Sequence, residues 1–448
     1  MRLSEAALET RAELHGADVR FLGCTTDSRA AVSGQLFIAL RGERFDGHDF
    51  IRQAVAAGAV AYIGEAADAG CPAPMLKVAE TRAAMSALAA SWRNRFKIPV
   101  IAVTGSNGKT TVKEMLQRIL SLAAPVIATR GNLNNEIGVP LTLFQLGADH
   151  RYAVVEMGAS APGEIQKLAR LARPTVAVIT QCAPAHLEGF GSVAGVARAK
   201  AEIYAGLPAD GAAIINLDDG HAPLWLKETE HLRQIRFGMD PAAEVRALDL
   251  RIDPETGESA FSLAAFGGSV TLRLALVGRH NVTNALAAAA CCLALGIGLD
   301  TIRSGLEAMR PVPGRLQIKA GIRHSRIYDD TYNANPGSLV AAMQTVGSLP
   351  GRNWLALGDM AELGPGAADF HLEAGEQARR YGFERLYAFG VHSVQAVAGF
   401  GQGARHFADK AELIAALRSD LQEGVRVLVK GSRSMAMEGV VAKLAEGN

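Results

Sequence analysis

The chain has 448 residues and an almost balanced charge, with 46 basic and 45 acidic residues. The net charge of +1 provides no overall field that would recruit nucleic acid or an anionic membrane, so any anionic ligand must be bound by a local site. Hydrophobic residues make up 49% and charged residues 20% of the chain, as in globular proteins, and the length favours two to three domains.

Neither a leader peptide nor a membrane span is expected. Charged residues are spread through the first twenty positions, which leaves no apolar stretch of the signal-peptide kind. The longest apolar run, residues 285–295, is too short to cross a bilayer and predicts a buried helix. The five cysteines form no Cys-x-x-Cys pair, so they indicate neither a disulfide framework nor a zinc site. We therefore expect a reduced, cytoplasmic protein.

Residues 1–81 have the pattern of a small α/β domain. Short β patterns are present at 35–40 and 59–64. Helical patterns are present at 4–14 and 49–57, and glycine-rich turns separate these segments.

Residues 82–310 alternate between short apolar runs and helical patterns. Strands are expected at 100–103, 126–128, 152–156, 175–180 and 212–216, and helices at 110–122, 163–171 and 192–206. Continuous apolar runs are typical of buried parallel strands. The region therefore predicts a central, doubly wound parallel sheet like that of P-loop ATPases. Alternating strands broken by Pro254 and glycines predict an antiparallel patch at 244–277.

A proline-rich segment at 311–314 ends this region and predicts a stiff hinge. Further strands are expected at 326–329, 354–357, 386–389 and 426–429. Residues 311–448 thus predict a third, Rossmann-like α/β domain with its own parallel sheet. The expected fold class is α/β with three domains.

Residues 98–111 are the most informative segment. A β-branched run ends in Thr-Gly-Ser-Asn-Gly-Lys-Thr-Thr at 104–111, and a helical pattern follows. Free N–H groups of such a loop and the dipole of the following helix favour a phosphate. Lys109 is expected to reach the terminal phosphates, and Thr110 to hold Mg²⁺. Because Val103 stands where the pattern G-x-x-x-x-G-K-[ST] has its first glycine, an ordinary glycine turn is the alternative.

Further candidates follow the predicted strands, at the edge where open α/β sheets bind ligands. Glu156 ends one strand and is a candidate Mg²⁺ ligand, with a solvated loop carboxylate as the alternative. His186 follows another strand and is either a ligand or a structural histidine. Lys200 lies on a predicted helix, and its local pattern alone indicates a solvated lysine. Asn281 suits a helix N-cap, or the edge of an adenine.

The last third of the chain adds three polar features. Asp-Asp-Thr-Tyr-Asn-Ala-Asn-Pro at 329–336 places more hydrogen-bonding side chains after a strand than a turn needs. Arg315 follows the hinge and is a candidate for binding phosphate, because its planar fork suits oxyanions. Lys-Gly-Ser-Arg-Ser at 430–434 is a candidate nest for a small anion or carboxylate.

Motifs spread over essentially the whole chain resemble those of the Mur ligases of peptidoglycan synthesis. They are Thr-Asp-Ser-Arg at 26–29, Gly-Glu-Arg-Phe-Asp-Gly-His at 42–48, the loop at 104–111, Gly-Asn-Leu-Asn-Asn-Glu-Ile-Gly at 131–138, Ala-His-Leu-Glu-Gly-Phe at 185–190, Pro-Gly-Arg-Leu at 313–316, Tyr-Asn-Ala-Asn-Pro at 332–336, Gly-Asp-Met-Ala-Glu-Leu-Gly at 358–364 and Val-Lys-Gly-Ser-Arg-Ser at 429–434. The motifs at 332–336 and 358–364 are similar to those of family members that add D-alanyl-D-alanine.

The resemblance implies an ATP-dependent enzyme that joins D-alanyl-D-alanine to UDP-N-acetylmuramoyl-tripeptide through an acyl phosphate. It implies that residues 1–81 hold the UDP end of this substrate and that residues 82–310 bind ATP. Residues 311–448 would close over ATP and bind the incoming dipeptide. A monomer satisfies everything that the motifs require.

The resemblance also implies roles for individual residues. Catalytic roles fall on Lys109, His186, Lys200 and Arg315. ATP contacts fall on Gly105, Asn107, Gly108, Lys109, Thr110, Thr111, Asn281, Asn284, Arg315 and Asp330. One Mg²⁺ would be held by Thr110 and Glu156, and a second by His186 and a carbamylated Lys200. Substrate contacts fall on Asp27, Ser28, Arg29, Phe45, Asp46, His48, Asn134, Asn135, Tyr332, Asn333 and Asn335.

Two alternatives and one departure remain at the level of the sequence. A sister ligase would add a single amino acid to a related acceptor. A nucleotide-switch protein would bind ATP without ligation, but it leaves the cluster at 329–336 without a role. Gln181-Cys182 stands where many relatives have an asparagine-containing run, so an asparagine contact there is left open.

Overall fold

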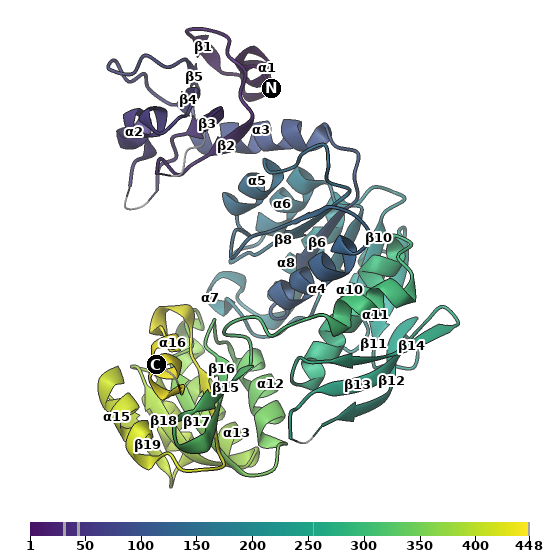
Figure 1. The fold of residues 1–448 in the computed structure, drawn as a ribbon, viewed down its shortest axis with the longest axis vertical. Helices are drawn as coiled ribbons and strands as arrows, with labels where there is room; N and C mark the ends of the chain where they lie inside the picture. Colours follow the sequence, from purple (N-terminus) through teal and green to yellow (C-terminus); the bar gives the residue numbers. More distant parts are fainter. Residues whose placement is uncertain (30–32, 43–44, 254, 447–448) are drawn as a thin grey trace.

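The computed structural model describes residues 1–29, 33–42, 45–253 and 255–446. Glu43 and Arg44 of the motif at 42–48, Pro254, and the last two residues of the expected third domain lie outside this description. Three α/β units follow one another along an arc, with the N-terminus in the first unit and the C-terminus in the third (Figure 1). The expected three-domain α/β class is confirmed.

The first unit is built on a five-stranded sheet with the order β1-β5-β4-β3-β2, parallel except for the β1–β5 pair. Its elements are α1 (Leu3–Thr10), β1 (Glu13–His15), β2 (Gly23–Thr25), β3 (Gln35–Ile38), η1 (Gly47–Phe50), α2 (Ile51–Ala56), β4 (Ala61–Gly64) and β5 (Met75–Lys77). The helix expected at 4–14 is too long. Arg11 adopts a left-handed conformation with φ of 53°, which ends α1 and lets the next residues pair with β5.

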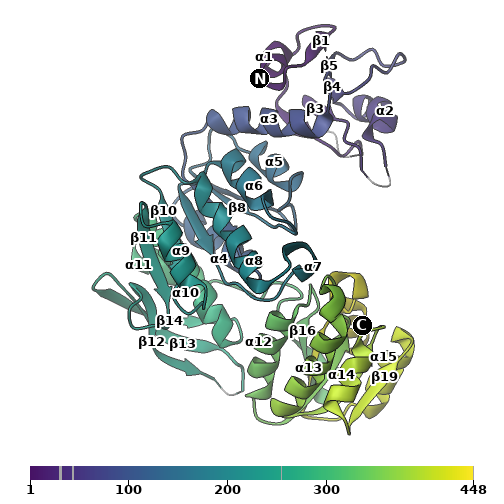
Figure 2. The same ribbon diagram turned by 180° about the vertical axis from the view of Figure 1, so that it is seen from behind.

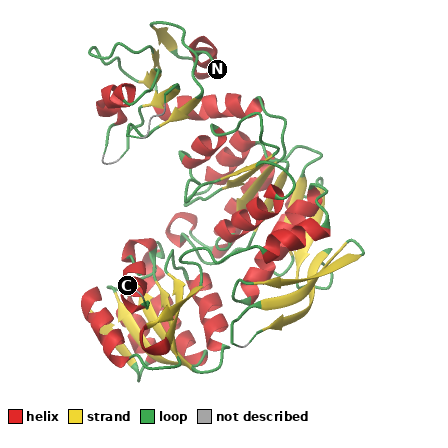
Figure 3. Ribbon diagram, in the orientation of Figure 1, coloured by secondary structure: helices red, strands yellow, loops and turns green. Residues whose placement is uncertain are grey.

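The second unit contains a nine-stranded sheet with the order β14-β13-β12-β11-β10-β9-β6-β8-β7. Its strands are β6 (Val100–Thr104), β7 (Val126–Ala128), β8 (Tyr152–Glu156), β9 (Val176–Ile179), β10 (Ala212–Asn216), β11 (Arg233–Gly238), β12 (Val245–Ile252), β13 (Ser259–Ala265) and β14 (Gly268–Leu274). The strands from β7 to β12 pair in parallel, whereas β12, β13 and β14 form the expected antiparallel patch. In Figure 3 this patch extends beyond the helices of the unit.

Helices cover both faces of the central sheet. They are α3 (Thr81–Asn94), α4 (Lys109–Ser121), α5 (Gly138–Leu143), α6 (Glu164–Ala172), α7 (Leu187–Phe190), α8 (Val193–Ala201), η2 (Glu202–Gly206), α9 (Ala222–Glu228), α10 (Arg279–Ala294) and α11 (Leu299–Glu307). Along β6, Val100 and Ala102 pack with α3, α5 and α6, while Ile101 and Val103 pack with α4, α10 and α11. This alternation buries β6 on both sides. The apolar run expected as a buried helix is the core of α10.

The third unit contains a six-stranded sheet with the order β15-β16-β20-β17-β18-β19. Its elements are β15 (Gln317–Gly321), η3 (Ile322–His324), β16 (Ser325–Asp330), α12 (Pro336–Gly347), β17 (Arg352–Gly358), η4 (Gly364–Gly366), α13 (Ala367–Arg380), β18 (Phe383–Phe389), α14 (Ser393–Phe400), β19 (Ala404–Phe407), α15 (Lys410–Asp420), β20 (Val425–Lys430), η5 (Arg433–Met435) and α16 (Glu438–Leu444). Helices α12, α13 and α14 pack on one face, and α15 and α16 on the other. Figure 2 shows α12, α13 and α14 from the reverse side.

In the described part of the chain, no helix is both long and apolar enough to cross a membrane.

Candidate active site

A cavity of about 1030 Å³ lies where the second and third units meet. The second unit contributes the phosphate loop, the segments that follow β8, β9 and β10, and the start of α10. The third unit contributes Arg315, the segment after β16, part of α12, and Lys430 at the end of β20. The sites predicted after separate strands therefore converge, because the carboxyl ends of parallel strands share one edge of a sheet.

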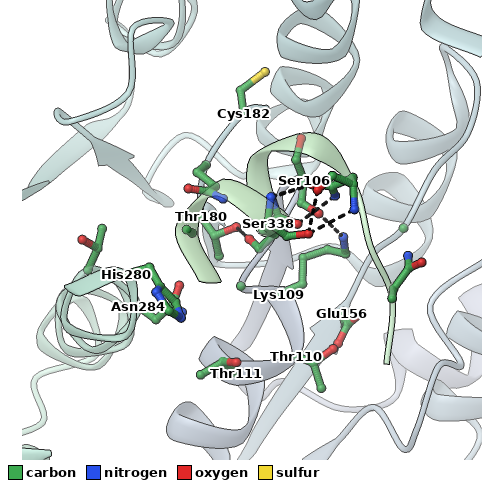
Figure 4. A pocket seen from close by; sticks show the side chains of 18 of the residues that line it. Ser106, Lys109, Thr110, Thr111, Glu156, Thr180, Cys182, His280, Asn284 and Ser338 are labelled. Atoms are coloured by element: carbon green, nitrogen blue, oxygen red, sulfur yellow. Dashed lines mark hydrogen bonds between the residues drawn. The ribbon is translucent and has the colours of Figure 1, made fainter. Parts of the chain in front are cut away.

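The phosphate loop needs glycine at two positions. Gly105 has φ of +150°, and a Cβ built there would lie 1.9 Å from Thr180 Oγ1. Gly108 is the N-cap of α4 with φ of +83°, and its Cβ would lie 2.4 Å from Asn284 Oδ1. The loop is thus held close to β9 and α10, and the thirteen-residue helix α4 begins at the cavity (Figure 4). This arrangement suits a phosphate at the helix N-terminus.

Lys109 and Arg315 bring two cations to this loop. Lys109 Nζ donates to the carbonyl oxygens of Gly105 at 2.7 Å and Ser106 at 3.4 Å. Burial lowers the pKa of Lys109, and Arg315 adds to that shift, while Glu156 opposes it. From the third unit, Arg315 Nη2 donates to Thr110 Oγ1 at 3.2 Å.

The Tyr332 ring packs against Arg315. The centre of the Tyr332 ring lies 4.1 Å from the guanidinium carbon, the geometry of a cation–π contact. Arg315 Nε is buried and has no hydrogen-bond partner among the described residues. A buried, unsatisfied donor beside the phosphate loop fits an oxyanion ligand.

Glu156 has the properties of a metal ligand. It ends β8 and is only 2% exposed, and its Oε1 accepts a hydrogen bond from Asn134 Nδ2 at 2.8 Å. Its other oxygen, Oε2, is buried and lacks a partner within the described ranges. Because an unpaired buried carboxylate oxygen is costly, the chemistry of this position fits a hard cation. The Thr110 hydroxyl lines the same cavity and could be a further oxygen ligand.

His186 lines the cavity, whereas Lys200 is buried behind it on α8 and does not line it. The side-chain amine of Lys200 forms no hydrogen bond or ion pair with any residue that the structure describes. Burial, together with the charge of Lys109, lowers the pKa of Lys200 to about 7. His186 Nδ1 pairs with Glu362 of the third unit. No group of three His, Cys, Asp or Glu gathers among the described residues, so a metal here would need other donors as well.

Asn281 and Asn284 occupy the first turns of α10. Asn284 Nδ2 donates to Asn281 Oδ1 at 3.1 Å, and Asn281 Nδ2 donates to the Val277 carbonyl at 2.8 Å. The N-cap interpretation of Asn281 is wrong, because Gly278, with φ of +98°, is the N-cap. Sequence reasoning also missed His280, which lines the cavity beside Asn284 (Figure 4). Its position directly before the candidate Asn281 is the signal in the sequence that could have indicated it.

Asp330 and Lys430 form an ion pair at the third unit's side of the cavity. Asp330 Oδ1 also accepts from the Leu316 amide at 3.1 Å, and Lys430 Nζ donates to the Asn333 carbonyl at 2.9 Å. The lysine that the sequence suggested for an anion nest thus binds a carboxylate and a carbonyl. It fixes the segment after β16.

Asn335 links the third unit directly to the phosphate loop. Its Nδ2 donates to Asn107 Oδ1 at 2.8 Å, and Asn107 Nδ2 donates back to Asn335 Oδ1 at 3.3 Å. The same Asn335 oxygen accepts from the Ser338 amide and caps α12. One side chain therefore both begins α12 and joins two units.

The sequence-predicted residues of the first unit do not line this cavity. They are Asp27, Ser28, Arg29, Phe45, Asp46 and His48. Asp27 binds Arg29 in two hydrogen bonds between side chains, and Asp46 pairs with His48. Phe45 is 71% exposed. Asn134, Asn135, Tyr332 and Asn333, by contrast, do line the cavity.

The segment that departs from the family pattern supports the phosphate loop through its backbone. The Gln181 carbonyl accepts from the Ser106 amide at 2.8 Å. The Cys182 amide donates to Asp219 Oδ2, a carboxylate that sequence analysis did not single out. The side chains at 181 and 182 are thus not needed for these bonds.

Comparison with known proteins agrees with this architecture. Residues 20–93 match the model described as "Mur ligase family, catalytic domain", residues 103–292 the "Mur ligase middle domain", and residues 314–433 the "Mur ligase, glutamate ligase domain". The chain is 44% identical over 439 residues to the UDP-N-acetylmuramoyl-tripeptide–D-alanyl-D-alanine ligase of Escherichia coli, covering 97% of this chain and 96% of that one. The Bacillus subtilis ligase of that name is 36% identical over 440 residues, covering 95% and 93%.

Solved structures show the same similarity. A MurF crystal structure from Acinetobacter baumannii has a TM-score of 0.92 and 36% identity, covering 98% of both chains. MurF from Thermotoga maritima in complex with ADP has a TM-score of 0.84 and 28% identity, covering 95% of this chain and 96% of that one. The chain belongs to the Mur ligase family. The resemblance found in the sequence motifs is confirmed, and so is the class of enzyme, a ligase.

Proposed function

We propose that this chain joins D-alanyl-D-alanine to UDP-N-acetylmuramoyl-tripeptide at the expense of ATP. The observation that supports this most strongly is the convergence of Lys109, Thr110 and Glu156 of the second unit with Arg315 of the third at one cavity. The relatives from Escherichia coli and Bacillus subtilis, which are similar over nearly the whole chain, are named as ligases of these two substrates. A nucleotide switch would not need these two units to share a phosphate site.

The reaction proceeds in two steps. The terminal carboxylate of the tripeptide attacks the γ-phosphate, which gives an acyl phosphate and ADP. The amine of the dipeptide then attacks the activated carbonyl, and phosphate leaves from the tetrahedral intermediate. Because the first step brings two anions together, the positive charges of Lys109 and Arg315 lower its barrier. Tyr332 keeps the Arg315 fork in position for the γ-phosphate.

The metal ligands assigned are Thr110 and Glu156 for one Mg²⁺, and His186 and Lys200 for a second. When bound, Mg²⁺ neutralises phosphate charge. Lys200 would act as a carbamate, which converts a buried cation into an anionic oxygen ligand. The lowered pKa of its amine supports this assignment, because CO₂ adds to the neutral form.

The remaining assignments concern the nucleotide and the acceptor. The amides of Gly105, Asn107, Gly108 and Thr111 would bind phosphate together with Lys109. Asn281 and Asn284 would contact adenine, and Asp330 the ribose. We assign residues 1–81 to the UDP end, 82–310 to ATP, and 311–448 to the dipeptide and to closure over ATP. We assign the enzyme to the cytoplasm. A monomer contains every residue that these assignments use.

The test is phosphate release from ATP with Mg²⁺ and UDP-N-acetylmuramoyl-tripeptide, compared between D-alanyl-D-alanine and single amino acids. Release only with the dipeptide is expected, and Lys109→Met should abolish it. Release with a single amino acid would assign the chain to a sister ligase. Nucleotide binding without release in any mixture would favour the switch.

A further inference from the structure

His186 and Glu362 face each other across the boundary between the second and third units. His186 precedes α7, and Glu362 lies between β17 and η4. The Glu362 carboxylate pairs with Nδ1 of the His186 imidazole. Both residues have left-handed backbones, with φ of 50° and 61°. Non-glycine residues rarely adopt this conformation, and where they do so at functional sites the surrounding structure enforces it.

The loop that presents Glu362 is fixed to the third unit through the two residues Asp359 and Met360. The Met360 amide donates to Nε2 of the buried His371 at 3.0 Å. The Asp359 carboxylate accepts from the amides of His392 and Ser393, and its carbonyl accepts from the Ser432 amide at 2.9 Å. The backbone just before Glu362 is therefore part of the third unit.

The contact forms only when the third unit lies against α7. Gly364 lies at this boundary, where a Cβ would lie 3.7 Å from Glu188 Cα. The His186 ring lines the same large cavity as the phosphate loop. Glu362 thus reaches a group of the second unit's site from outside that unit.

A carboxylate on one ring nitrogen of a histidine has a well-defined effect on the other. A metal-binding histidine commonly donates its second N–H to a carboxylate, which fixes the tautomer and ring orientation and makes the ligating nitrogen more basic. Here the Glu362 carboxylate is in contact with Nδ1, so Nε2 is the nitrogen left for a metal. The structure brings a carboxylate of a different domain against the imidazole, but Nδ1 makes no hydrogen bond of good geometry with any described residue.

We propose that Glu362 is a positioning residue for His186, which couples closure of the third unit to binding of the second metal ion. The inference rests on the proposed role of His186 as a metal ligand. When the third unit closes, Glu362 orients the imidazole and raises its affinity for the cation. When it opens, the support is lost and the second ion binds weakly, so the full site forms only in the closed enzyme.

The test measures Mn²⁺ binding to the full chain by electron paramagnetic resonance. ADP is present in place of ATP, so that no turnover takes place. Glu362→Gln removes the charge, and Glu362→Gly suits the left-handed backbone while removing the carboxylate. Both should weaken the weaker Mn²⁺ site by about 10- to 100-fold and leave the tighter one unchanged. Glu188→Gln, which removes a charge from the same boundary without touching His186, is the matched control. Thermal unfolding verifies that each variant is folded.

The outcomes distinguish the coupling by Glu362 from the role of His186 as a metal ligand. If His186→Ala weakens the second site but both Glu362 variants bind Mn²⁺ like the unmodified chain, the coupling is wrong and the proposed metal ligand stands. If His186→Ala itself leaves both sites unchanged, the metal assignment fails, and the coupling fails with it. If Glu362→Gly binds normally and only Glu362→Gln is weak, the carboxylate is not the cause, which also overturns the inference.

Discussion

Lys200 should make the free energy of unfolding of the metal-free protein depend on pH, and replacing Lys200 by methionine should remove this dependence. The Lys200 amine is buried on α8 and has no ion pair in the described part of the chain. Its pKa falls from the ordinary 10.5 to about 7, chiefly because burial removes water from the charged form. Lys200→Met retains an unbranched side chain and removes the titrating group.

The sign follows from proton binding. Between pH 7 and 10.5 the unfolded chain keeps the Lys200 proton and the folded chain loses it. The free energy of unfolding therefore rises with pH in this range, by at most about 1.4 kcal/mol per pH unit. Holding the amine in the folded protein costs about 4 kcal/mol at pH 7, and this penalty shrinks by about 2 kcal/mol by pH 9. Below pH 7 it is nearly constant.

Urea unfolding in EDTA and carbonate-free buffer measures the effect. The stability of Lys200→Met relative to the unmodified chain should be greatest near pH 7 and should decrease by about 2 kcal/mol by pH 9. Lys167→Met, at an exposed lysine that lines the large cavity, is the control and should show no such trend. A constant difference between Lys200→Met and the unmodified chain from pH 7 to 9 would refute the argument from burial.

Three further substitutions test the phosphate loop and its contacts. Gly105→Ala should lower the free energy of unfolding by about 2–4 kcal/mol, because the new Cβ displaces the Thr180 hydroxyl and strains the backbone; an unchanged urea midpoint contradicts this. Asn335→Asp keeps the capping oxygen but loses the donor to Asn107, so the KM for ATP should rise by up to about tenfold with unchanged thermal stability. Arg315→Lys keeps the charge but loses the planar guanidinium, and kcat for phosphate release should fall by about 10²- to 10³-fold. A decrease in kcat of less than about threefold would show that the guanidinium geometry has no role.

The parts of the fold that could be predicted are those with long apolar runs. The strand at 152–156 is β8 over the same residues, because a strand buried on both faces has an unbroken apolar pattern. The three-residue strand β2 (Gly23–Thr25) is too short to show a period and was not predicted, whereas β7, of the same length, is an apolar run and was expected at 126–128. The helix expected at 4–14 failed because a left-handed turn at Arg11, which no local pattern signals, ends it early.

The candidate site divides along a similar line. Lys109 and Thr110 follow from a local motif, because loop and helix are adjacent in sequence. For Lys200, local reasoning indicated a solvated lysine, whereas the structure buries it, and only the family resemblance anticipated a role. The Asn107–Asn335 and His186–Glu362 contacts join residues that are far apart in the chain, and a single sequence contains no signal for such pairs.

The position of β20 in the third sheet has a consequence for synthesis and truncation of the chain. This strand is nearly the last element of the sequence, yet it lies between β16 and β17 and pairs with both. A polypeptide that stops before Val425 leaves both of those strands with open, largely apolar edges, which favour aggregation. It also lacks Lys430, so the Asp330 carboxylate loses its counterion. We therefore expect no ligase activity from a chain that stops before Val425, because the lining of the large cavity is completed only near the end of the sequence.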